Sequence, residues 1–195
     1  MSKNMKYDRE DVVKKATDLY WEKGFHGTSM RNLQDVIDMR PGSIYSTFGS
    51  KEGLYKEALQ YYADMGVQQL EACRKVTSSP LDALKMFMKK LIIGSCHSAP
   101  SGMCLLAKTV AELTEENADL LAEAKRLLNV MEEAFVEVLV QAQECGELDK
   151  SKDTVAFARY IQVQILGLRT YLRVNDNDNL DIDKLIDELF DKGIS

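Results

Sequence analysis

Apolar residues recur at intervals of three and four along most of the chain, which is the spacing of one face of an α-helix. No run of alternating apolar and polar residues is long enough to predict a strand. The pattern therefore predicts an all-α chain of about nine helices. The clearest segments are expected at about 8–23, from 51 into the 70s, 81–91, 103–113, 120–142, 155–168 and 182–190, with a loop at 95–102 and a turn at 175–179.

Residues 28–51 depart from this regular pattern, because two short helical segments flank a tight turn. Ser29 can cap the first segment, since a side-chain oxygen satisfies a backbone N–H that has no partner at a helix start. Pro41 ends that segment and suits the first position of the next helix. There, Ile44 and Phe48 lie four residues apart on one face, and small hydroxyl residues occupy the rest. This layout suits insertion of the second helix into the major groove of DNA.

Residues 6–66 resemble the DNA-binding domain of the TetR family of bacterial transcriptional regulators. The segments WEKGFHGTSM and GSIYSTFGSKEGLY match the spaced pattern of that family at many positions. Asp38 stands where the family usually has glycine, and aspartate tolerates the left-handed backbone of such a turn better than most residues. Arg40 and Pro41 also depart from the pattern, at the helix that reads bases. The resemblance implies a three-helix head with its helix-turn-helix at about 29–48.

Position along these two helices predicts how each polar residue meets DNA. The N-terminal part of the second helix contacts base edges in such proteins, so Arg40, Ser43 and Ser46 are candidates for base reading. Arg40 suits a bidentate contact with guanine and equally a phosphate contact. A purely structural turn would explain Ile44 and Phe48 but not the polar face. The candidate DNA-binding residues, including those expected to bind phosphate, are Thr28, Ser29, Arg31, Arg40, Pro41, Gly42, Ser43, Tyr45, Ser46, Thr47 and Lys51.

Charge is distributed unevenly, which answers an apparent objection to DNA binding. The net charge is −6, but residues 1–60 carry +1 and residues 61–195 carry −7. The acidic part can point away from DNA while local lysine and arginine side chains meet phosphate. No apolar run approaches the roughly 18 residues of a membrane span, and the first residues form no apolar signal segment. We therefore expect a cytoplasmic protein with no membrane contact.

The remaining residues, 67–195, predict a helical body. Its segments GMCLLAKTVAEL, AQECGEL and QILGLRTYLR resemble the effector domain of one large branch of the TetR family. The resemblance implies a homodimer built through the last two helices and a small-molecule pocket among the middle helices. Ligand sites are mostly apolar with few polar groups, although the same residues would serve equally as ordinary core. The candidate pocket residues are Met86, Phe87, Met103, Cys104, Met131, Phe135, Tyr160 and Gln164.

These features predict a ligand-responsive repressor that binds a near-palindromic operator as a homodimer and is released by a small-molecule effector. The alternative on the same fold is a thiol-based redox or electrophile sensor that uses Cys104, with Lys108 one helical turn away. Control by a protein partner is a further option, which an exposed apolar patch would favour. We expect no enzyme activity and no cofactor, because no nucleophile motif or phosphate loop occurs. We also expect no metal site, since only Cys96, His97 and Cys104 come near one another in sequence.

Overall fold

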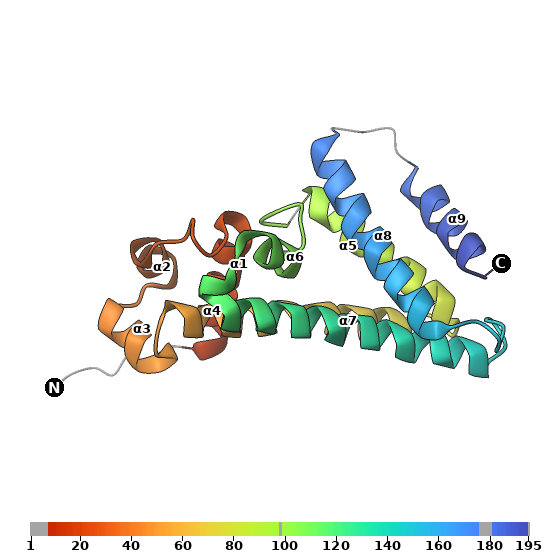
Figure 1. Cartoon of the computed structure of the whole chain (residues 1–195), viewed down its shortest axis with the longest axis horizontal. Helices are drawn as coiled ribbons and strands as arrows, with labels where there is room; N and C mark the ends of the chain where they lie inside the picture. The colour runs from red at the N-terminus through yellow and green to blue at the C-terminus, as the bar shows by residue number, and fades with distance from the viewer. Residues whose placement is uncertain (1–7, 98, 176–180, 195) are drawn as a thin grey trace. The chain divides into compact units, whose positions relative to one another are not determined.

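The computed structural model describes residues 8–97, 99–175 and 181–194, and the regular structure in these ranges is helical throughout (Figure 1). Within them lie nine α-helices and one 3-10 turn, which confirms the all-α prediction. None of these helices is both long enough and apolar enough to cross a membrane. The turn predicted at 175–179 falls, apart from Asn175, outside the described residues. The helices are α1 (Arg9–Lys23), α2 (Met30–Ile37), α3 (Pro41–Phe48), α4 (Lys51–Arg74), α5 (Pro80–His97), α6 (Leu105–Glu112), α7 (Ala118–Glu144), α8 (Thr154–Val174) and α9 (Ile182–Ile194), with the 3-10 turn at Glu115–Asn117.

Side-chain caps set several helix boundaries. Asp8 starts α1 and Asp153 starts α8, and each carboxylate accepts a hydrogen bond from the backbone N–H two residues further on, at 3.0 and 2.9 Å. Two helices run further than predicted. α5 continues through His97 into the expected loop, because Gly94 inside a helix costs only about 1 kcal/mol and does not end it. α8 continues past its apolar stretch to Val174.

The chain folds into two compact units that do not follow the order of the sequence. The first unit contains Met1–Tyr62 and Leu105–Leu127, and the second contains Ala63–Cys104 and Leu128–Ser195. Packing therefore groups α6 and the first part of α7 with α1, α2 and α3. The domains predicted at 6–66 and 67–195 divide the chain at a different place.

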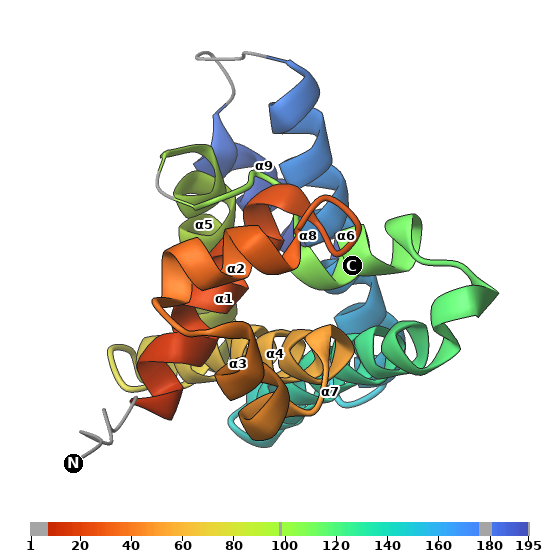
Figure 2. The same ribbon diagram turned by 90° about the vertical axis from the view of Figure 1, so that its left-hand side faces the viewer.

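The core of the first unit joins α1 and α4 to α6 through buried tyrosines, with α2 and α3 connected by a short turn (Figure 2). The rings of Tyr20 and Tyr55 meet edge to face, with centroids 4.6 Å apart. The hydroxyl of Tyr55 lies 2.6 Å from that of Thr109 in α6. Burial raises the pKa of both tyrosines, so their hydroxyls stay protonated as hydrogen-bond donors. The short helices α2 and α3 therefore belong to a unit to whose core α6 contributes.

The core of the second unit combines aliphatic, aromatic and methionine side chains from α5, α7, α8 and α9. The rings of Phe87 and Phe135 lie 5.7 Å apart between their centroids. Arg169 of α8 is also buried, and its Nε donates a hydrogen bond to the carbonyl of Gly102 at 3.2 Å. A guanidinium inside the unit therefore holds the segment that follows α5. Exposed ion pairs also join α5 to α9, namely Lys85–Asp187 and Lys89–Asp183.

Candidate nucleic-acid interface

α2 begins with a capping box made from two uncharged side chains. The hydroxyl oxygen of Ser29 accepts a hydrogen bond from the backbone N–H of Asn32 at 3.1 Å, and Oδ1 of Asn32 accepts one from the backbone N–H of Ser29 at 3.0 Å. The third helical position of such a box usually holds glutamate or glutamine. Neither α2 nor α3 has an acidic residue in its first turn. No carboxylate in the first turn of either helix therefore offsets the positive end of its dipole, which suits an anionic partner.

The turn between α2 and α3 has the backbone that its sequence suggests. Asp38 adopts the left-handed conformation, with φ 52° and ψ 41°, and its N–H donates to the carbonyl of Gln34 at 3.0 Å. Arg40 is extended, with φ −70° and ψ 150°, as sterics before proline require. α3 then starts at Pro41, whose missing N–H would have had no partner at that position. Aspartate therefore serves in this turn where the family usually has glycine.

α3 separates a buried face from a polar face. Ile44 and Phe48 are buried, whereas 49% of Tyr45 is exposed and the following two residues, Ser46 and Thr47, are exposed as well. Gly42 is also exposed, and a Cβ added to it would meet no atom within 4 Å. Packing inside the protein therefore does not require glycine at this position. The helix presents small and polar groups outward over its whole length, as the sequence predicts.

The structure exposes eight of the eleven predicted DNA-binding residues and buries the other three fully or in part. Ser43 is half-buried, and Thr28 is fully buried with its hydroxyl donating to the carbonyl of Gly24 at 2.7 Å. This position does not suit the predicted phosphate contact of the Thr28 hydroxyl. Lys51 is half-buried, and its ammonium group donates to the carbonyl of Phe25 at 2.6 Å. The exposed predicted residues are Ser29, Arg31, Arg40, Pro41, Gly42, Tyr45, Ser46 and Thr47.

Lys51 contacts the turn that precedes α2 through more than its hydrogen bond. Its Nζ lies 4.2 Å from the centroid of the Phe25 ring, so the ammonium group also makes a cation–π contact. Burial lowers the pKa of Lys51, and the nearby carboxylates of Glu52 and Glu112 oppose that shift. Lys51 therefore supports the turn from within the protein, whether or not it also reaches a phosphate.

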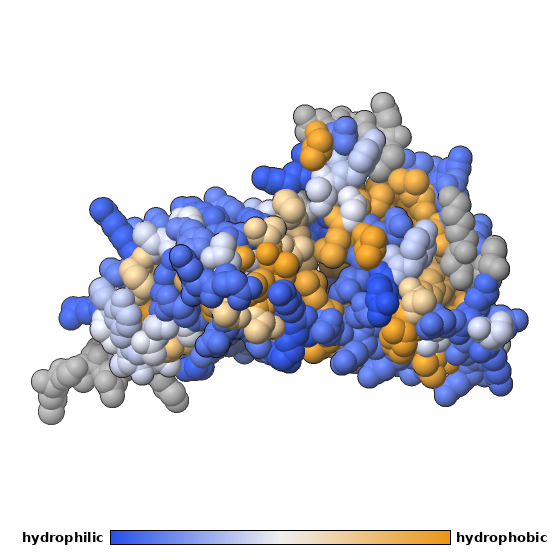
Figure 3. All heavy atoms as spheres, viewed as in Figure 1, coloured by the Kyte–Doolittle hydropathy of each residue, from blue (hydrophilic) through white to orange (hydrophobic). Residues whose placement is uncertain are grey.

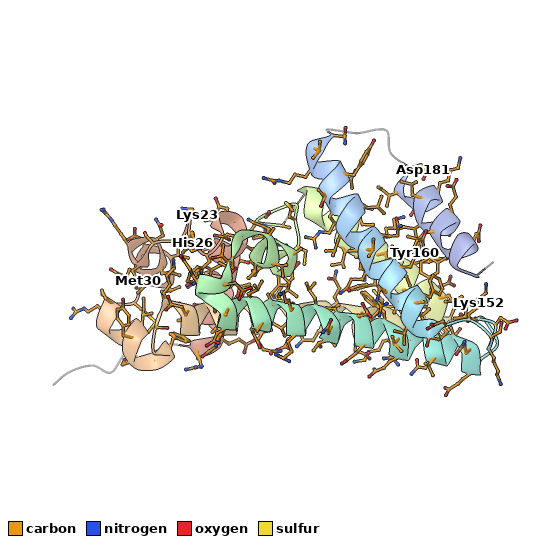
Figure 4. All side chains as sticks on the ribbon, viewed as in Figure 1. Lys23, His26, Met30, Lys152, Tyr160 and Asp181 are labelled. Atoms are coloured by element: carbon orange, nitrogen blue, oxygen red, sulfur yellow. The ribbon has the colours of Figure 1, made fainter. Side chains whose placement is uncertain are left out.

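Two residues of α6 also bind the backbone around this turn, a role that the sequence did not predict. The turn itself can be located in Figure 4 from the labels on Lys23 at the end of α1, His26 in the turn and Met30 at the start of α2. Glu112 of α6 accepts hydrogen bonds from the backbone of this turn, and Lys108 of α6 donates hydrogen bonds to the end of α1. In the sequence, Lys108 and Glu112 are two charged residues one helical turn apart in a mostly apolar segment. That spacing does not identify their partners, which lie more than 80 residues away along the chain.

Most predicted effector residues lie in or against the core of the second unit. Phe87 and Phe135 belong to that core, and Met86, Met131 and Tyr160 pack against it. The other three candidates lie elsewhere: Met103 and Cys104 directly precede α6, and Gln164 is half-buried in α8. The side chains of Cys96 and His97 are not among those that the structure describes.

Four large apolar side chains of α8 are exposed. Val155, Val163, Tyr171 and Val174 are all exposed, the last to 76%. Successive members of the first three are eight residues apart, which is about 80° around an α-helix, so together they spread over roughly 160° of its circumference. In Figure 3, apolar surface is visible over α8 in the second unit. Several exposed apolar side chains on one helix favour contact with another protein surface.

Known proteins resemble this chain over nearly its full length. The family model of bacterial regulatory proteins of the tetR family matches residues 12–58, and that of the tetracyclin repressor-like C-terminal domain matches residues 80–182, more than half of the chain. The transcriptional regulator YezE of Bacillus subtilis is 24% identical over 190 residues, covering 97% of this chain and 96% of its own. The transcriptional repressor ComR of Escherichia coli is 26% identical over 168 residues, covering 83% and 78%. Among solved structures, the TetR-family regulator CifR, a cysteine mutant in complex with 26-bp operator DNA, superposes with a TM-score of 0.79 at 21% identity, covering 97% and 96%.

Proposed function

The chain belongs to the TetR family of bacterial regulatory proteins, and from this premise we propose that it is a homodimeric repressor released from its operator by a small-molecule effector. It is a DNA-binding transcriptional regulator, and it acts in the cytoplasm where its operator lies. The observation that carries the proposal is the face of α3. This helix buries Ile44 and Phe48 and turns Gly42, Tyr45 and Ser46 outward.

The dimer follows from the geometry of operator reading. Each subunit places α3 in one major groove, so two subunits read half-sites about 34–36 Å apart, roughly one helical turn of DNA. The operator is therefore near-palindromic. The exposed apolar side chains of α8 support pairing of subunits through the last two helices.

The proposal includes two further parts: the protein represses transcription, and a small-molecule effector releases it from the operator. The relatives ComR and DhaR are named transcriptional repressors, which supports repression. An effector releases the operator only to the extent that it binds one conformation of the protein more tightly than the other. The half-buried methionines and Tyr160 around the second core are the candidate contacts, because methionine fills and adapts to irregular apolar space.

Selection of genomic DNA fragments by the purified protein tests the proposal. The native protein is expected to enrich a near-palindromic sequence, and Tyr45→Ala is expected to enrich it far less while keeping the same thermal stability. Tyr45 is exposed, so its truncation should change stability by no more than about 0.5 kcal/mol. Failure of the native protein to enrich any sequence, before and after refolding to remove bound ligand, would contradict sequence-specific regulation.

A further inference from the structure

The α1–α2 turn, residues 24–28, is held by two charged side chains that lie outside the helix-turn-helix. Oε2 of Glu112 accepts the backbone N–H of Phe25 at 3.0 Å, and Oε1 accepts that of His26 at 2.7 Å. Nζ of Lys108 donates to the carbonyl of Trp21 at 2.7 Å and to that of the next residue, Glu22, at 3.1 Å. One carboxylate therefore binds two N–H groups after the end of α1, and one ammonium group binds two carbonyls before it.

The backbone of the turn is fitted to this carboxylate. Gly24 has φ +79°, a conformation that residues with a Cβ rarely adopt. A Cβ at this position would also lie 2.5 Å from Oε2 of Glu112, well inside van der Waals contact. The carboxylate can approach the turn this closely only because residue 24 has no side chain.

Other polar groups of the turn are also bound. The N–H of Gly24 donates to the carbonyl of Tyr20 at 2.8 Å, and its carbonyl accepts from the Thr28 hydroxyl. The carbonyl of Phe25 accepts from Lys51. Since Thr28 directly precedes the residue that caps α2, the path of this turn sets the point and the direction from which α2 starts.

We propose that Glu112 and Lys108 are positioning residues for DNA reading, which fix how α2 and α3 leave α1. The inference rests on the proposed function and extends its machinery to α6, more than 50 residues beyond the end of α3. The compact units support it, because α6 packs in the same unit as the reading helices.

A positioning role differs measurably from a merely stabilising one. Attraction of lysine and arginine to phosphates tolerates a small change of helix orientation, whereas base contacts depend on exact placement of their atoms. Loss of positioning therefore lowers binding to the operator more than binding to other DNA. A stabilising role alone would lower the unfolding temperature and leave the ratio of the two affinities unchanged.

The test measures that ratio in the full-length variants Glu112→Gln and Lys108→Met. The probes are the duplex that the wild-type protein selects from a random library and a scrambled duplex of the same length and composition. We expect affinity for the selected duplex to fall about tenfold, roughly 1.4 kcal/mol, with much less change for the scrambled one. Glu116→Gln and Lys125→Met make the same charge changes at exposed sites of the same unit and serve as matched controls. Amide exchange at Phe25 and His26 should accelerate in Glu112→Gln but not in Glu116→Gln.

Each outcome decides the inference. An unchanged affinity ratio in both variants, or an equal change in the charge controls, overturns the positioning role. Where Glu112→Gln does not fold, Lys108→Met alone carries the test, because it removes two other hydrogen bonds, those to the end of α1. A wild-type protein that selects no sequence refutes the proposed function, and the inference falls with it. A wild-type protein that selects a sequence which the variants bind with equal specificity refutes the inference alone.

Discussion

The start of α2 in the first unit and the core of the second unit are stabilised by different kinds of contact. In the first unit, the carboxylate of Glu112 and the amide oxygen of Asn32 accept hydrogen bonds from backbone N–H groups, and Lys51 donates one to a backbone carbonyl, so that one geometry is fixed around the start of α2. In the second unit, the core is built mainly from aliphatic, aromatic and methionine side chains. Hydrogen bonds demand set distances and angles, whereas apolar cores accept different packings of similar volume. The comparison suggests that DNA reading depends on backbone placement, and effector binding on packing.

The largest effect should come from opening the second core. Phe135 is 2% exposed and packs against Phe87, so Phe135→Ala is expected to lower the free energy of unfolding by about 3–5 kcal/mol. Urea unfolding measures this loss. Operator affinity of the folded protein, measured well below the transition, should change little. Val140→Ala on the same helix, at an exposed site, is the control. A loss below about 1 kcal/mol would show that Phe135 already borders open space, and would break the picture of a closely packed core.

A substitution in α3 should separate DNA affinity from stability. Gly42→Ala adds a methyl group that meets no protein atom within 4 Å, so stability should hold or rise by up to about 1 kcal/mol. Operator affinity should fall about tenfold, because the methyl group blocks close approach of the helix to DNA. Gly94→Ala makes the same change in α5, again where the added atom meets nothing, and should leave operator affinity intact. Equal operator affinity for both variants would show that Gly42 lies away from the DNA.

The smallest effect tests charge at the start of α2. Asn32→Asp keeps an oxygen that caps the helix, so stability should change by less than about 0.5 kcal/mol. The added negative charge should weaken operator binding a few-fold, and more at low salt than at high salt. Asn129→Asp introduces the same charge at an exposed site of the second unit and is the comparison. Identical salt dependence in both variants would place the α2 start away from phosphate.

The reading helices were predictable because their signals are local. A proline at the first helical position, apolar residues four apart and a turn residue that tolerates positive φ all act within a few residues of one another. The structure accordingly buries Ile44 and Phe48, exposes Tyr45 and gives Asp38 a left-handed backbone. The first helix, expected at about 8–23, spans Arg9–Lys23 and begins directly after its capping residue Asp8.

The less predictable features depend on partners distant in sequence. A threonine hydroxyl or a lysine ammonium group can bind a phosphate or a backbone carbonyl, and only tertiary packing shows that Thr28 and Lys51 each donate to a carbonyl. The hydrogen bonds of Glu112 to the α1–α2 turn join segments more than 80 residues apart. Arg169 likewise lies in a largely apolar helix. Its hydrogen bond to Gly102 forms because α8 lies beside the segment that follows α5. Periodicity reports which face of a helix is buried but not what it is buried against.

The discontinuity of the first unit bears on how such regulators can be recombined. A hybrid that joins residues 1–66 to the effector part of another protein would separate the α1–α2 turn from its own α6. The amide of Phe25, a buried residue, would then need a new acceptor, because a buried donor left without one costs about 1–3 kcal/mol. A hybrid that transfers residues 105–127 together with the reading helices keeps the carboxylate of Glu112 and the glycine that accommodates it. In this protein, the part to be transferred into a hybrid therefore consists of two separate segments, Met1–Tyr62 and Leu105–Leu127.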